Sequence, residues 1–174
     1  MTACAAIKAR APVLRYFDAI DGASNMQPQL TDSTRKVLDQ AQTEARNLNQ
    51  EFVGTEHLLL GMLGCHNCHV SRVLRQHHVD REAVRTQLLT VLGYAEENPN
   101  VTGSLPLSPK AQRAVNAAVV MSRSLREPKV STRVLLLALM DEPKTVFVHA
   151  LRETGVDVES LVRGLGEKPT EEEA

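Results

Sequence analysis

The feature that most constrains this chain is a direct internal repeat. Residues 30–82 can be laid over residues 107–159 without a gap, and identical residues recur along the whole length. The matched pairs are Leu30 and Leu107, Ala41 and Ala118, Arg46 and Arg123, Leu48 and Leu125, Val53 and Val130, Thr55 and Thr132, Leu58–Leu60 and Leu135–Leu137, Leu74–Arg75 and Leu151–Arg152, Val79–Asp80 and Val156–Asp157, and Glu82 and Glu159. A match at one fixed offset is the signature of a tandem duplication. The chain must therefore fold as two copies of one unit.

Each copy is patterned as helices. Thr31 and Ser108 are placed to cap a first helix, and Pro109 stands at the favoured first position of the helix in the second copy. Thr55 and Thr132 are expected to cap a second helix, whose leucine run is apolar on nearly every side and so belongs in the core. Apolar residues recur at helical spacing in the first helix; in the first copy they are Val37, Leu38, Ala41, Ala45 and Leu48.

The rest of each copy predicts two more helices. A short third helix is expected over residues 70–76 and over residues 145–152. Asp80 and Asp157 are placed to cap a fourth helix, which ends near Gly93 and Gly166. We therefore predict an all-α fold of two four-helix repeats related by a pseudo-twofold axis. The predicted division is a lead-in or targeting segment (1–27), repeat 1 (28–93), a linker (94–106), repeat 2 (107–166) and an acidic tail (167–174).

Charge and composition exclude several classes of partner. A net charge of −1 and a pI of about 6.6 leave no basic field for nucleic acid or an anionic membrane. Aromatic residues make up only 3%, too few for base stacking, and no apolar run approaches the roughly 20 residues that span a bilayer. Three cysteines are too few for a disulfide framework, so the cytoplasm is the expected compartment. A plastid or other organelle is the alternative, because the first 17 residues lack acids and are rich in Ala.

The stretch FVGTEHLLLGML, residues 52–63, is the candidate binding site. Gly54 allows a tight entry and Thr55 is expected to cap the helix, so that backbone N–H groups of residues 55–57 face outward at a positive helix end. Such an end can hold an anion, and Glu56 offers a carboxylate to a guanidinium. Together with His57, these residues could hold a group that is anionic at one end and cationic at the other.

A purely structural interpretation accounts for the same residues. Glu56 is a favourable first-turn residue and His57 can be a packing residue. In the second copy Arg133 stands in the place of Glu56 and would repel a guanidinium, and Ser131 stands in the place of Gly54. Any guanidinium site is therefore expected in the first copy alone.

A cysteine–histidine cluster follows the second helix of the first copy. Cys65, His66, Cys68 and His69 are candidate metal ligands, because thiolates and imidazoles bind zinc well, and the histidines at 77–78 could assist. A redox pair and a C-x-x-C-H haem attachment signature are the alternatives. A zinc site normally needs a second ligand pair, haem attachment needs export, and the second copy has DEPK at this place. The default expectation is an exposed loop with oxidisable thiols, without metal or other cofactor.

No catalytic constellation accompanies these residues. The sequence has neither a G-x-S-x-G elbow nor a G-x-x-x-x-G-K-[ST] phosphate loop. Its carboxylates are spread along helix faces, as solvated residues are. We therefore expect a protein that binds and is not an enzyme.

The duplicated motif resembles the Clp repeat domain, the N-terminal domain of ClpA/ClpC-type AAA+ unfoldases. LTDSTRKVLDQAQTEARNLNQEFVGTEHLLLGML is similar to the first repeat of a ClpC-type domain, and VSTRVLLLALM to a degraded second helix start. The resemblance covers about residues 28–166. Because no ATPase module is present in this sequence, it implies a stand-alone accessory protein similar to the plastid ClpT type. In some ClpC-type domains the GTEH helix starts resemble phosphoarginine sites, which implies that Thr55 contacts phosphate and Glu56 pairs with the guanidinium.

The resemblance leads to three functional hypotheses. The first is a non-catalytic adaptor or accessory subunit of a Clp ATP-dependent protease, which binds protein substrates, the unfoldase or the peptidase core through the GTEH face or the groove between repeats. The second is a free-standing sensor of damaged or phosphoarginine-marked proteins. The third is a thiol- or metal-dependent regulator that uses Cys65 and Cys68.

Overall fold

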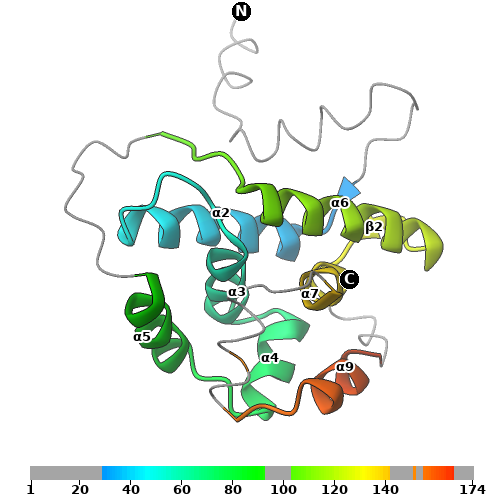
Figure 1. The fold of residues 1–174 in the computed structure, drawn as a ribbon. Coiled ribbons are helices and arrows are strands. Elements are labelled where there is room, and N and C mark those ends of the chain that lie inside the picture. The colour runs from blue at the N-terminus through cyan, green and yellow to red at the C-terminus, as the bar shows by residue number, and fades with distance from the viewer. Residues whose placement is uncertain (1–28, 93–102, 142–150, 152–154, 167–174) are drawn as a thin grey trace, which may run out of the picture.

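The computed structural model describes residues 29–92, 103–141, 151 and 155–166, which form helices and two very short strands (Figure 1). The predicted all-α class is confirmed, and the third helix expected over 145–152 lies outside the described residues apart from Leu151. Repeat 1 contains β1 (Gln29–Leu30), α2 (Asp32–Asn47), α3 (Thr55–Gly64), α4 (His69–Gln76) and α5 (Arg81–Leu92). Repeat 2 contains α6 (Pro109–Ser124), β2 (Lys129–Val130), α7 (Thr132–Asp141) and α9 (Val158–Gly166).

Three of the predicted helix caps are present. The Thr31 hydroxyl accepts a hydrogen bond from the Thr34 backbone N–H at 3.2 Å, and the Ser108 hydroxyl accepts one from Ala111 at the same distance. The Asp80 carboxylate accepts from the Ala83 N–H at 2.9 Å. Each cap satisfies an N–H group that has no partner within its own helix, so α2, α6 and α5 begin where the sequence predicts.

The two repeats are joined by reciprocal backbone pairing. Leu30, before the first helix of repeat 1, pairs in parallel with Val130, before the second helix of repeat 2. Val53 and Leu107 form the same parallel bridge with the repeats exchanged. The Ser108 N–H donates to the Val53 carbonyl at 2.9 Å, and the matching bond from Thr31 to Val130 is 3.2 Å. The two copies are therefore joined by the same backbone pairing in both directions.

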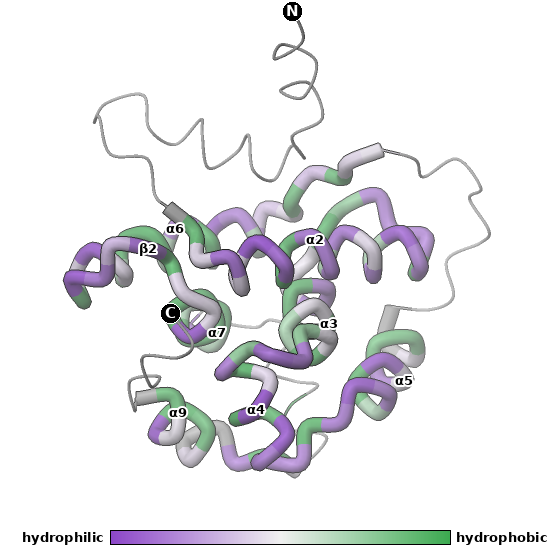
Figure 2. The backbone as a smooth tube through the Cα atoms, turned by 180° about the vertical axis from the view of Figure 1, so that it is seen from behind, coloured by the Kyte–Doolittle hydropathy of each residue, from purple (hydrophilic) through white to green (hydrophobic). Residues whose placement is uncertain are grey.

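The core lies along the leucine-rich helices of both repeats. Leu58, Leu59 and Leu60 on α3 are fully buried, and so is Leu136 on α7. Figure 1 shows α3 at the centre of repeat 1, with α2 on one side and α4 on the other. In Figure 2 most of α7 and much of α3 are hydrophobic, whereas α2 is largely hydrophilic. No helix in the described part of the chain is long and apolar enough to cross a membrane.

The end of the predicted linker is attached to α2. The Gln42 side-chain amide donates to the Leu105 carbonyl and accepts from the Leu105 N–H, both at 2.9 Å. The Arg46 guanidinium donates to the Gly103 carbonyl at 2.9 Å. Residues 103–106 are therefore held against repeat 1 immediately before α6 begins, while residues 93–102 lie outside the described part of the chain.

Gly61 allows α3 to approach the backbone of α2. A Cβ atom at this position would lie 2.5 Å from the Val37 carbonyl oxygen and 3.0 Å from the Ala41 nitrogen. Both are backbone atoms inside a helix and cannot move aside alone. At Gly64, on the same helix, the nearest atom would be Cγ of the flexible Gln40 side chain, at 3.1 Å.

We predict that Gly61→Ala lowers the free energy of unfolding by about 1–3 kcal/mol, because the added methyl pushes the two helices apart. Gly64→Ala is the matched control and should stay within about 1 kcal/mol of wild type, since alanine also favours a helix. Urea unfolding followed by circular dichroism measures both. Equal effects of the two substitutions would contradict the close approach at Gly61.

Candidate functional site

The GTEH segment lies at the start of α3, and its cap differs from the predicted one. Gly54 is the N-cap, with extended backbone (φ −89°, ψ 177°), and Thr55 is the first helical residue. The Gly54 N–H donates to Nδ1 of His57 at 2.9 Å. Pairing of Val53 with repeat 2 keeps the backbone extended through Gly54, so the helix cannot begin earlier. The expectation that Thr55 caps this helix is therefore wrong.

The same correction applies to repeat 2. The Ser131 hydroxyl accepts from the Val134 N–H at 3.4 Å, and Thr132 is the first residue of α7. Val130, like Val53, is held in a parallel pair directly before the cap. In both repeats the residue before the threonine occupies the cap.

Glu56 is the member of the segment that reaches solvent. Its side chain is 16% exposed, whereas Thr55 and His57 are 2% and 1% exposed and Gly54 is buried. The carboxylate folds back over Gly54, since a Cβ atom there would lie 2.0 Å from Oε1 of Glu56. The Thr55 hydroxyl donates to Oε2 at 3.2 Å. A ligand from solvent would therefore meet the Glu56 carboxylate first.

His57 does not neutralise this carboxylate. Nδ1 of His57 lies 3.6 Å from Oε1 of Glu56, but it already accepts the Gly54 N–H and so carries no proton in this arrangement. Burial lowers the pKa of His57, and the nearby carboxylates of Glu56 and Glu44 only partly oppose this effect. Among the described residues, Glu56 thus has no cationic partner at neutral pH.

A buried carboxylate beneath the site was not predicted. Glu44 on α2 is 1% exposed, forms an ion pair with Arg81 at the start of α5, and accepts from the Gln40 amide at 3.1 Å. Its position on the apolar stripe of α2, three residues after Ala41, was the available sequence signal. Oε2 of Glu44 and Nε2 of His57 are both buried without a hydrogen-bond partner in the described structure.

The matching helix end in repeat 2 already holds a guanidinium. Arg133 is only 7% exposed, forms an ion pair with Glu127, and donates to the Leu165 carbonyl at the end of α9 at 3.3 Å. Glu127 also accepts from the Ser131 hydroxyl at 3.1 Å. The two helix starts thus share a backbone arrangement, but their charged groups differ.

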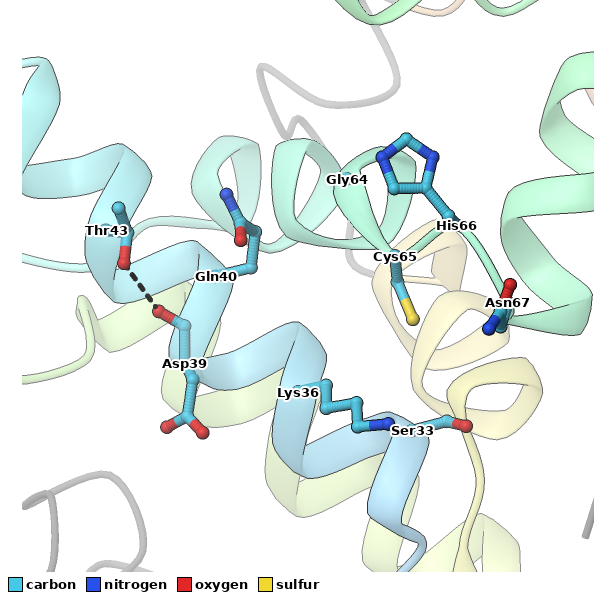
Figure 3. Close-up of a pocket in the computed structure, with 9 residues that line it drawn as sticks. All are labelled: Ser33, Lys36, Asp39, Gln40, Thr43, Gly64, Cys65, His66 and Asn67. Carbon is cyan, nitrogen blue, oxygen red and sulfur yellow. Dashed lines mark hydrogen bonds between the residues drawn. The ribbon is translucent and has the colours of Figure 1, made fainter.

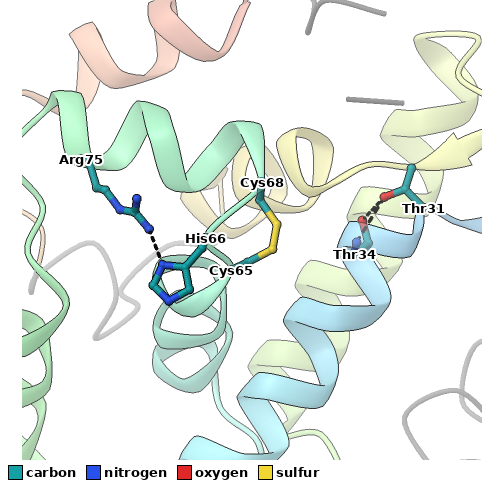
Figure 4. Close-up of a disulfide and its surroundings, with 6 residues drawn as sticks. All are labelled: Thr31, Thr34, Cys65, His66, Cys68 and Arg75. Atoms are coloured by element: carbon teal, nitrogen blue, oxygen red, sulfur yellow. Dashed lines mark hydrogen bonds between the residues drawn. A yellow bond between two sulfur atoms is a disulfide. The ribbon is translucent and has the colours of Figure 1, made fainter. Parts of the chain in front are cut away.

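Cys65 and Cys68 form a disulfide between α3 and α4 (Figure 4). Their Cα atoms are 5.6 Å apart, within the usual range for the bond. Cys68 is the N-cap of α4 and only 2% exposed, so the expectation of two thiols on an exposed loop is wrong for this residue. Cys65 is partly exposed.

The histidines beside the disulfide do not complete a metal site with it. Nδ1 of His66 is 3.2 Å from the Arg75 guanidinium, and His69 is the first residue of α4. Within the described residues, no group of three or more His, Cys, Asp or Glu side chains is placed to hold a metal ion.

A polar pocket not expected from the sequence adjoins the disulfide (Figure 3). One wall is a single face of α2, and the other is the turn after α3. The lining residues are Ser33, Lys36, Asp39, Gln40, Thr43, Gly64, Cys65, His66 and Asn67. Lys36 and Asp39 give this pocket both signs of charge.

Comparison with known proteins places this fold among Clp N-terminal domains. The family model described as "Clp repeat (R) N-terminal domain" matches residues 29–168. A ClpA homologue of Cyanidium caldarium, an ATP-dependent Clp protease ATP-binding subunit, is 33% identical over 147 residues, which is 82% of this chain and 17% of the relative. The chloroplastic chaperone protein ClpC2 of rice is 29% identical over 82% of this chain and 16% of its own length. The chain thus spans about a sixth of these relatives.

Solved structures agree on the fold. The N-terminal domain of ClpD from Arabidopsis thaliana superposes with a TM-score of 0.67 at 18% identity, covering 83% of this chain and 96% of that one. A ClpV N-domain in complex with a VipB peptide gives a TM-score of 0.59 at 20% identity, covering 79% and 88%.

We predict that His57 makes the protein less stable in acid. Because the folded-state pKa of His57 is lowered, the unfolded chain binds more protons below its ordinary pKa of 6.5, and stability falls as the pH decreases through that value. His57→Asn keeps an oxygen that can accept the Gly54 N–H but removes the titration. Urea unfolding at pH 7.5 and 5.5 should show a smaller loss in the variant. Equal losses in both proteins would contradict this assignment.

Proposed function

Because the chain belongs to the Clp repeat N-terminal domain family, we propose that it is a non-catalytic adaptor or accessory protein of a Clp ATP-dependent protease. It binds protein substrates, the unfoldase or the peptidase core. In the relatives, the region similar to this chain makes up about a sixth of the protein. A ClpV N-domain has been solved with a VipB peptide bound. Both facts favour protein binding as the role of this fold. The proposed compartment is the cytoplasm, with a plastid as the alternative because several relatives are chloroplastic.

The observation that carries the proposed binding site is the unpaired Glu56 carboxylate. It is partly exposed, it stands at the start of a buried helix, and the described residues supply it with no cation. A guanidinium can form two parallel hydrogen bonds with such a carboxylate, which makes arginine-bearing segments the favoured ligand. In repeat 2, Arg133 and Glu127 already form a guanidinium–carboxylate ion pair within the chain, which supports a single site in repeat 1.

Phosphoarginine is the more demanding ligand for this site. A phosphate at the positive end of α3 competes with the Glu56 carboxylate, which already covers Gly54. Thr55 is buried, and its hydroxyl donates to Glu56. Phosphoarginine therefore binds only if the Glu56 side chain turns from Gly54 toward the guanidinium and exposes the Thr55 N–H and hydroxyl to the phosphate.

We predict that Glu56→Gln weakens binding of an arginine-rich peptide about tenfold, because a neutral amide replaces a charge-assisted pair. Glu51→Gln, on the exposed preceding loop, is the matched control and should bind as wild type does. Calorimetric titration with the peptide, and with its phosphoarginine form, measures both variants. Unchanged binding by Glu56→Gln would remove Glu56 from the site.

The accessory role is tested with purified partners. Sedimentation of the protein with a ClpC-type unfoldase and its peptidase from the same organism should give a complex, and the protein should change the rate of ATP-dependent substrate degradation. A faster rate indicates delivery and a slower rate indicates inhibition. If the protein binds marked substrates but neither Clp component, the free-standing sensor replaces the accessory role.

A further inference from the structure

The structure assigns a reversible dithiol–disulfide site to Cys65 and Cys68, which exchanges with cellular thiols through the sulfur of Cys65. The two cysteines come from the end of α3 and the start of α4, and the fold holds their Cα atoms 5.6 Å apart. This assignment does not depend on the proposed ligand of Glu56. Glu56 lies in the first turn of α3 and Cys65 is the C-cap residue of the same helix, so the two sites are roughly 13 Å apart along its axis.

A purely structural role explains the pair poorly. The bond joins residues only three positions apart, and so short a loop restricts the unfolded chain less than a long one. Packing already holds this corner, since Leu63 at the end of α3 and Val70 in α4 are both buried. In repeat 2 the aligned positions are Glu142 and Thr145, so the repeat does not require a disulfide there.

The two cysteines differ in exposure. Cys65 is partly exposed and lines the polar pocket, whereas Cys68 is 2% exposed (Figures 3 and 4). Lys36 and Asp39 line the same pocket, so an approaching thiolate meets both a cationic and an anionic side chain there. An external thiol can therefore reach Cys65 and is kept from Cys68.

The difference in access sets the order of bond changes. A thiolate attacks Sγ of Cys65, the bond between Cys65 and Cys68 breaks, and Cys68 leaves as a thiolate that then takes up a proton. Cys68 is the N-cap of α4, where the positive helix end stabilises this leaving thiolate. A second external thiolate attacks the external sulfur of the mixed disulfide and releases Cys65. Two external thiols are oxidised to one disulfide, and the protein gains two electrons and two protons.

The test uses glutathione as the probe. Every protein carries Cys4→Ser, so that Cys65 and Cys68 are the only cysteines whose thiols are counted. The folded protein is equilibrated at several ratios of reduced to oxidised glutathione, quenched with acid and alkylated, and its thiols are counted by mass. We expect full and reversible conversion between no free thiol and two. A disulfide that persists in the folded protein under excess reduced glutathione, or thiols that stay free under oxidised glutathione, would overturn the assignment.

Single variants test the order of attack. Cys68→Ser leaves the accessible sulfur and should form the mixed disulfide with glutathione at least about tenfold faster than Cys65→Ser, which leaves the buried one. Circular dichroism confirms that both variants are folded. Equal rates, or faster reaction of Cys65→Ser, would contradict attack at Cys65. Glu56→Gln should exchange thiols as wild type does, so failure here is separable from failure of the proposed ligand site.

Discussion

The structure depends on the exchange of backbone hydrogen bonds between the two repeats. A residue just before the first helix of each repeat pairs with a residue just before the second helix of the other repeat. Leu30 pairs with Val130, and Leu107 pairs with Val53. Parallel pairing of this kind requires extended backbone at those residues. The start of α3 is therefore fixed by repeat 2, and this places Gly54 at the cap, His57 inside and Glu56 at the surface.

The same constraint gives the two repeats an equivalent helix start, at which their charged groups differ. Both second helices begin two residues after a paired valine, with the cap residue between, so both present a positive helix end at an equivalent place. In repeat 1 the chain places a carboxylate there and supplies no cation from the described residues; in repeat 2 it places Arg133 and pairs it with Glu127. At equivalent places on the two backbones, repeat 1 thus carries the proposed cation site, and repeat 2 carries a cation of its own, Arg133.

Local sequence predicted the parts of the fold that local chemistry decides. The fixed offset revealed two copies, and hydroxyl or carboxylate residues revealed the caps at Thr31, Ser108 and Asp80. The misplaced cap at Thr55 had a different cause, since the residue that sets it, Leu107, is 52 positions away in the chain and no local pattern reports it. The proposed binding segment was chosen from its unusual mixture of charged residues and leucines, and its ligand stays a prediction.

Contacts between residues far apart in the chain determine the features that local sequence did not predict. The burial of Glu44 depends on Arg81, 37 residues away, and the attachment of residues 103–106 to α2 depends on the Gln42 amide reaching Leu105. The spacing of Cys65 and Cys68 allowed a metal, a haem, a redox pair or free thiols, and the bend between α3 and α4 brought the two sulfurs together while burying one. In each case the side chain has a clear chemical role only once its distant partner is known.

The most direct test of the account is a map of where arginine and phosphoarginine bind, made by following backbone amide signals in nuclear magnetic resonance spectra during titration. The account predicts that the amides of residues 54–57 shift with ligand concentration while those of residues 131–134 remain in place, because Arg133 already occupies the second helix start. Shifts at residues 131–134, or shifts that leave residues 54–57 untouched, would contradict a single cation-binding site at Glu56.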